Sequence, residues 1–153
     1  MMVVAGCSDQ GGISNYSKDI KRLKEEFVRL QVFPDQIPPY AESAYYLIDG
    51  GGIGQGALII RLGYMLSSDE IDLLLKELES NFSESTPGKV NRFLFGRFPL
   101  EPYEVEQLIP SDFRVFLVET ELSQIRESPN HNQLCAVAIS EQRGAVAFLF
   151  DSW

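Results

Sequence analysis

The fold is decided by the stretch Cys135-Ala136-Val137-Ala138-Ile139-Ser140-Glu141-Gln142-Arg143-Gly144-Ala145-Val146-Ala147-Phe148-Leu149-Phe150. Two apolar runs flank a short polar turn, a pattern typical of a β-hairpin. Pairing Ser140 with Ala145 sets a register in which large apolar side chains share one face: Ile139 with Val146, Val137 with Phe148, and Cys135 with Phe150. The other face carries alanines at positions 136, 138, 145 and 147. Because both faces are apolar, we expect the hairpin to be buried on both sides, with a helix close to the alanine face.

The next strongest pattern lies before the hairpin. Ser67-Ser68-Asp69-Glu70 has the form of a capping box, and the apolar residues that follow share one helical face: Ile71, Leu74, Leu75, Leu78 and Phe82. Around this helix we predict strands over residues 57–65, 90–96 and 113–119, and a short helix from Pro102 to Ile109.

The N-terminal part predicts a helix from Ser17 to about Leu30, with Ile20, Leu23 and Phe27 on its apolar face. Residues 45–48 suit either a strand or the last turns of a helix that ends at glycine. With 153 residues, the chain has the length of one domain and can bury a hydrophobic core large enough to make that domain stable. We therefore predict a single α+β domain over residues 17–153, with a mostly antiparallel sheet of about five or six strands and two or three helices packed on it.

The charge of the chain favours a basic partner. The net charge is −9, and residues 69–106 hold nine acidic side chains against four basic ones. A field of this sign repels phosphates, so we expect no nucleic-acid partner and instead a basic protein. The predicted partner-binding residues are Asp69, Glu70, Asp72, Glu77, Glu79, Glu84, Glu101, Glu104 and Glu106.

The N-terminus contains a segment that resembles a targeting signal. Val4-Ala5-Gly6-Cys7 has the form of a bacterial lipobox, although few apolar residues precede it. We expect residues 1–16 to be a flexible tether or the remnant of a signal. Lipidation of Cys7 would make the chain a periplasmic or outer-membrane lipoprotein, and it is otherwise expected in the cytoplasm. No apolar stretch approaches the roughly 18 residues that span a bilayer, so membrane attachment is expected only through Cys7.

No pattern indicates catalysis, a metal or a cofactor. Gly52-Ile53-Gly54-Gln55-Gly56-Ala57 matches the form of a dinucleotide-binding turn, but the β-branched residues that follow favour a glycine-rich connection. His131 is the only histidine and lies in a polar turn, which favours a solvated loop position. We therefore predict a protein that is not an enzyme, with no catalytic residues, no metal ligands and no cofactor.

One family resemblance bears on function. Three segments in this order resemble the start of SUKH-type immunity domains: a helix containing Leu23-Lys24-Glu25-Glu26-Phe27, then Ile37-Pro38-Pro39-Tyr40, then Tyr45-Tyr46-Leu47-Ile48-Asp49-Gly50-Gly51-Gly52-Ile53-Gly54, with Asp49 in place of the usual asparagine. The resemblance covers residues 17–56. It implies a second helix that ends at the glycines, and a non-catalytic inhibitor that neutralises a bacterial toxin. The alternative hypothesis is an envelope lipoprotein that binds a small ligand or a cell-wall component.

Overall fold

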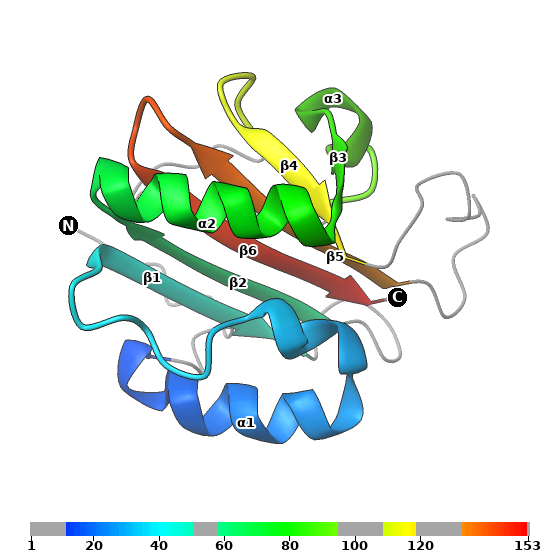
Figure 1. The fold of residues 1–153 in the computed structure, drawn as a ribbon. Helices are drawn as coiled ribbons and strands as arrows, with labels where there is room; N and C mark the ends of the chain where they lie inside the picture. Colours follow the sequence, from blue (N-terminus) through cyan, green and yellow to red (C-terminus); the bar gives the residue numbers. More distant parts are fainter. Residues whose placement is uncertain (1–11, 51–57, 95–108, 119–132, 153) are drawn as a thin grey trace, which may run out of the picture.

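The C-terminal hairpin forms the middle of a six-stranded antiparallel sheet in the computed structural model, which describes residues 12–50, 58–94, 109–118 and 133–152 (Figure 1). The strand order is β1-β2-β6-β5-β4-β3. The strands are β1 (Glu42–Asp49), β2 (Leu58–Met65), β3 (Ser83–Ser85), β4 (Arg114–Leu117), β5 (Gln133–Ser140) and β6 (Ala145–Ser152). With its helices, this sheet makes an α+β fold, as predicted.

The register of the hairpin is the one predicted from the sequence. Ser140 pairs with Ala145, and the three large apolar pairs face each other as expected. Both strands are buried on both faces. Gly144 closes the turn with a positive φ of 63°, a conformation that glycine adopts without steric cost.

All the longer helical elements cover one face of the sheet. They are α1 (Tyr16–Glu26), the 3-10 helix η2 (Val28–Val32) and α2 (Ser68–Asn81). In Figure 1, α2 lies across the front of the sheet and α1 lies on the side of β1. Helix α1 buries Tyr16, Ile20 and Leu23, and α2 buries Ile71, Leu75 and Leu78, in both cases at the spacing of one helical face. Together with the large side chains of the hairpin they form the main hydrophobic core.

The alanine face of the hairpin belongs to a second core. Ala136, Ala138, Ala145 and Ala147 are buried there against Val90, Ile109, Phe113 and other apolar residues. The expected helix on this face is reduced, within the described residues, to the single turn α3 (Pro87–Val90). Among the described residues, Ile109 and Phe113 add to this cover from outside any helix.

The alanine face of the sheet also holds a buried ion pair, between Arg61 and Asp151. Arg61 lies opposite Leu149, and Asp151 lies two residues further along β6, so the two charged side chains are on one side of the sheet. Each is 1% exposed. The Arg61 guanidinium donates to the Asp151 carboxylate and to the carbonyls of Ile60 and Phe150, at 3.0 and 3.2 Å for the carbonyls.

The two edge strands of the sheet are irregular or short. In β1 the register shifts between Glu42 and Tyr45, and Ser43 has a positive φ of 51°. At the other edge, β3 contains three residues and pairs with β4. The strand β1 also settles the open prediction for residues 45–48, which are extended rather than helical.

The helix predicted over residues 17–30 is interrupted. Helix α1 ends at Glu26, Phe27 is extended with φ −125° and ψ 102°, and η2 follows. The break turns the Phe27 ring onto the sheet, where its centroid lies 5.2 Å from that of Phe150. At the other end, Ile13–Asn15 form the 3-10 helix η1 and Tyr16 is fully buried, so the described part of the expected tether is folded.

The strand predicted over residues 90–96 is wrong in the part that the structure describes. Val90 ends α3 and a turn follows it. The Asn91 side chain bonds both main-chain groups of Ile109, accepting from its N–H at 2.8 Å and donating to its carbonyl at 3.2 Å, which holds this turn against the second core.

Of the helix predicted from Pro102, only Ile109 is described, and it is not helical. Phe82 is extended and ends α2 rather than continuing its apolar face. No described helix has the length and apolar character needed to cross a bilayer.

Candidate functional site

The acidic residues predicted to bind a partner divide into groups with different roles. Six of the nine are described, and all six lie on or next to α2: Asp69, Glu70, Asp72, Glu77, Glu79 and Glu84. Glu101, Glu104 and Glu106 lie outside the described residues, as do Cys7, the glycines 51–56 and His131.

Three of the six described carboxylates are engaged inside the protein. Glu70 completes the predicted capping box, accepting from the Ser67 N–H at 3.1 Å and from its hydroxyl at 2.8 Å. Glu79 and Glu84 lie 2.7 and 2.8 Å from the Arg114 guanidinium. The hydrogen bonds from Arg114 lower the pKa of Glu84, and those to Glu84 and Glu79 raise the pKa of Arg114. These three acids cap α2 or tie it and β3 to β4, so they hold the fold.

The other three carboxylates face solvent. Asp69, Asp72 and Glu77 are exposed on α2, and none makes an ion pair with a described residue. Leu73 lies among them and is 67% exposed, which is high for a large apolar side chain. The helical spacing places Asp69, Leu73 and Glu77 along one line of the helix surface. We call these four residues the α2 outer face.

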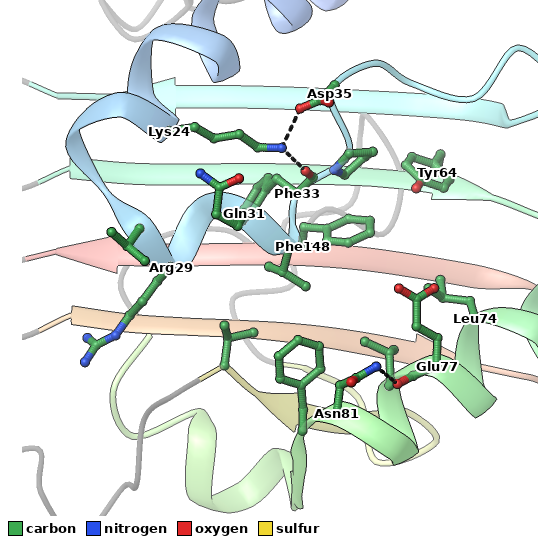
Figure 2. A pocket seen from close by; sticks show the side chains of 16 residues that line it. Lys24, Arg29, Gln31, Phe33, Asp35, Tyr64, Leu74, Glu77, Asn81 and Phe148 are labelled. Carbon is green, nitrogen blue, oxygen red and sulfur yellow. Dashed lines mark hydrogen bonds and ion pairs between the residues drawn. The ribbon is translucent and has the colours of Figure 1, made fainter.

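A groove lies beside this face, between η2 and α2. Its volume is about 700 Å³. Tyr64, Leu78 and Phe148 are buried and lie among its lining, so the sheet and the inner side of α2 form an apolar floor. Figure 2 shows Leu74, Glu77 and Asn81 on the α2 side, with Lys24, Arg29, Gln31 and Asp35 on the opposite side. The remaining lining residues are Val28, Val32, Phe33, Pro34, Phe82 and Val118.

The cations of the groove are already bonded within the protein. The Lys24 amine donates to the Phe33 carbonyl at 2.5 Å and to the Asp35 carboxylate at 2.6 Å (Figure 2). The hydrogen bond from Lys24 lowers the pKa of Asp35. Arg29 donates to the main-chain carbonyl of Gln133 at 3.1 Å, which fastens η2 to β5. The two side chains therefore shape the wall of the groove, and Glu77 at its rim forms no ion pair with either of them or with another described residue.

The groove contains no arrangement suited to proton transfer or metal binding in the described part of the chain. No three histidine, cysteine or acidic side chains gather there to hold an ion. Burial raises the pKa of Tyr64, so its phenol stays protonated across the physiological range. The arrangement is suited to binding: apolar surface in a concave site, beside a helix with free negative charge.

The sequence contained one usable signal for this site. In Ile71-Asp72-Leu73-Leu74-Leu75, Leu73 lies off the face formed by Ile71, Leu75 and Leu78, so its exposure follows from helical periodicity. The groove itself could not be inferred, because its walls come from η2 and α2, which are far apart in the sequence.

Comparisons with known proteins give no further guide to the site. No protein-family model matches the chain, and no curated protein or solved structure matches it either.

Proposed function

We propose that this chain is a non-catalytic bacterial immunity or inhibitor protein that binds a basic protein, such as a toxin, and blocks it by occlusion. The observation that carries the proposal is the α2 outer face: three carboxylates without ion pairs to described residues surround an exposed leucine. Such a surface offers an apolar contact with polar groups around it, and protein interfaces commonly combine an apolar centre with a polar rim.

Electrostatics supports a basic partner. The net charge of −9 attracts a cationic surface from a distance, and the exposed carboxylates of the α2 outer face give that attraction a defined place to dock. Glu79 and Glu84 are weaker candidates for this role because both carboxylates are already paired with Arg114.

The resemblance to SUKH-type immunity domains points to the same class of function but carries less of the proposal. It implies a helix ending at the glycines after Asp49, whereas residues 42–49 form β1. The proposal therefore depends on α2, which lies outside the residues of that resemblance.

The alternative function is an envelope lipoprotein, anchored through a lipidated Cys7, that binds a small ligand or a cell-wall component. One observation favours it: a groove of about 700 Å³ with an apolar floor falls within the usual size range of small-molecule sites. The mass of the mature protein, expressed with its native upstream region, tests it directly. Cleavage before Cys7 with added acyl mass supports the lipoprotein and its envelope location, and an unmodified protein contradicts it.

Charge reversal on α2 tests the inhibitor proposal. The variant Asp72→Lys with Glu77→Lys is compared with the matched variant Glu25→Lys with Glu26→Lys, which changes net charge equally on exposed positions of α1. Asp69 is spared because a carboxylate in the first turn stabilises the helix. Each is titrated by calorimetry against the products of neighbouring genes. We expect the α2 variant to weaken the complex at least about tenfold and the α1 variant to have little effect. Equal effects of the two variants contradict the proposal.

A further inference from the structure

We propose that the groove between η2 and α2 is an anchor site for a basic amphipathic segment of the protein partner, which inserts apolar side chains into it and sets lysine or arginine against Glu77. This inference rests on the proposed function, because it assigns the groove and the α2 outer face to one docking surface.

The shape of the groove supports an apolar anchor. Its floor is closed, since Phe148, Tyr64 and Leu78 are 3%, 6% and 2% exposed. Its walls are open, because Val28 is 72% exposed and Leu74 is half-buried. The apolar atoms of these walls are in contact with water. Covering them with an apolar side chain of the partner removes that surface from water and so contributes favourable binding free energy.

The charges at the rim favour a cationic segment over an anionic one. Lys24 and Arg29 are committed to Asp35 and to the Gln133 carbonyl, so neither is free to receive an anion without breaking a contact that shapes the wall. Glu77 is exposed at the rim and forms no ion pair with a described residue. Asp69, two turns earlier on the same line of α2, extends the negative charge along the helix beyond the groove.

An amphipathic helix combines both requirements. Apolar residues spaced by three and four positions enter a groove on one side, while basic residues on the flanks remain at the rim. Leu74 and Glu77 are three residues apart on α2, so an apolar contact and a charge contact lie next to each other along the same wall.

The test uses the full chain and a synthetic helical peptide of leucine and lysine. The leucines are spaced by three and four residues, so that they share one face of the helix. A matched peptide with serine in place of leucine measures attraction by charge alone. Binding is followed by fluorescence anisotropy and by amide chemical shifts of the labelled protein. We expect the leucine peptide to bind at least about tenfold more tightly than the serine peptide, with shifts centred on Val28, Val32 and Leu74.

Three protein variants separate the groove from the acidic face. Leu74→Gln alters the apolar groove wall, Glu77→Lys reverses the charge at its rim, and Ile13→Gln is the control, because Ile13 is a half-exposed apolar residue on η1 outside the groove lining. We expect the first two variants to bind the leucine peptide about tenfold more weakly than the original protein, and the third variant to bind it unchanged.

Two other outcomes overturn the inference in distinguishable ways. If only Glu77→Lys weakens binding of the peptide and the shifts spread over α2, the groove is not the anchor, although the acidic face of the proposed function stands. If only Leu74→Gln weakens it, and the serine peptide shows no charge-dependent binding, the groove takes neutral apolar ligands and the basic partner is excluded. Chemical shifts of unbound Leu74→Gln report whether that variant is folded, and Val28→Gln at the exposed lip replaces it if it is not.

Discussion

Replacing Arg61 by methionine should destabilise the protein far more than any surface substitution. Arg61 and Asp151 are each 1% exposed, and the guanidinium also bonds the carbonyls of Ile60 and Phe150. Methionine fills a similar volume but leaves the Asp151 carboxylate buried beside an apolar group. Breaking a buried pair in this way costs about 3–5 kcal/mol, a large part of the roughly 5–15 kcal/mol that stabilises a typical domain.

The double variant Arg61→Met with Asp151→Leu decides whether the buried charge is the cause. With both charges gone, we expect the free energy of unfolding to return to within about 1–2 kcal/mol of the original. Urea unfolding followed by far-ultraviolet circular dichroism measures all three proteins. Asp35→Asn is the control, because the Asp35 side chain of the Lys24 pair is 88% exposed and its loss should leave the midpoint almost unchanged. A single variant as stable as the original, or a double variant no better than the single, would refute the reasoning.

Three further substitutions test other parts of the fold. Gly144→Ala should cost about 2 kcal/mol, because φ is +63° and the new Cβ would lie 2.8 Å from the Leu66 carbonyl oxygen; an unchanged thermal midpoint would contradict this. The hydrogen bond from Arg143 lowers the pKa of Asp112, so the carboxylate stabilises the fold above its unfolded pKa of about 3.9 and loses this contribution as pH falls through the lower folded value. Asp112→Asn should therefore cost about 1 kcal/mol near neutral pH and progressively less as the pH falls below about 3.9, and a cost in urea unfolding that does not change with pH counts against the bond. Leu75→Ala should cost about 2–5 kcal/mol by urea unfolding, since Leu75 is 6% exposed at the centre of α2, and a loss under 1 kcal/mol would mean that the helix is loosely packed.

The elements that local patterns specify were predictable. The hairpin register follows from apolar pairing around a turn, and α2 follows from its capping box and its periodic leucines. The helix across Phe27 was predicted too long because the periodicity continues to Leu30, and only the packing of Phe27 against Phe150 shows the break. Strand β3 was missed because three polar residues carry no pattern of their own and form a strand only by pairing with β4.

The site was predictable in part for a similar reason. Sequence alone identifies the acidic region, but it does not show that Arg114, which is 30 residues from Glu84, forms ion pairs with two of the acids. Interactions between distant residues separate structural carboxylates from free ones. The same holds for the groove, whose two walls come from η2 and α2.

The edges of the sheet have a consequence for the behaviour of the chain in concentrated solution. A new strand would find a bulge at the start of β1 and three residues in β3, with Glu84 at its centre. Neither edge presents the long, flat row of main-chain groups that templates fibrils. We therefore expect the protein to resist open-ended polymerisation through strand addition, which leaves association to surfaces formed by side chains.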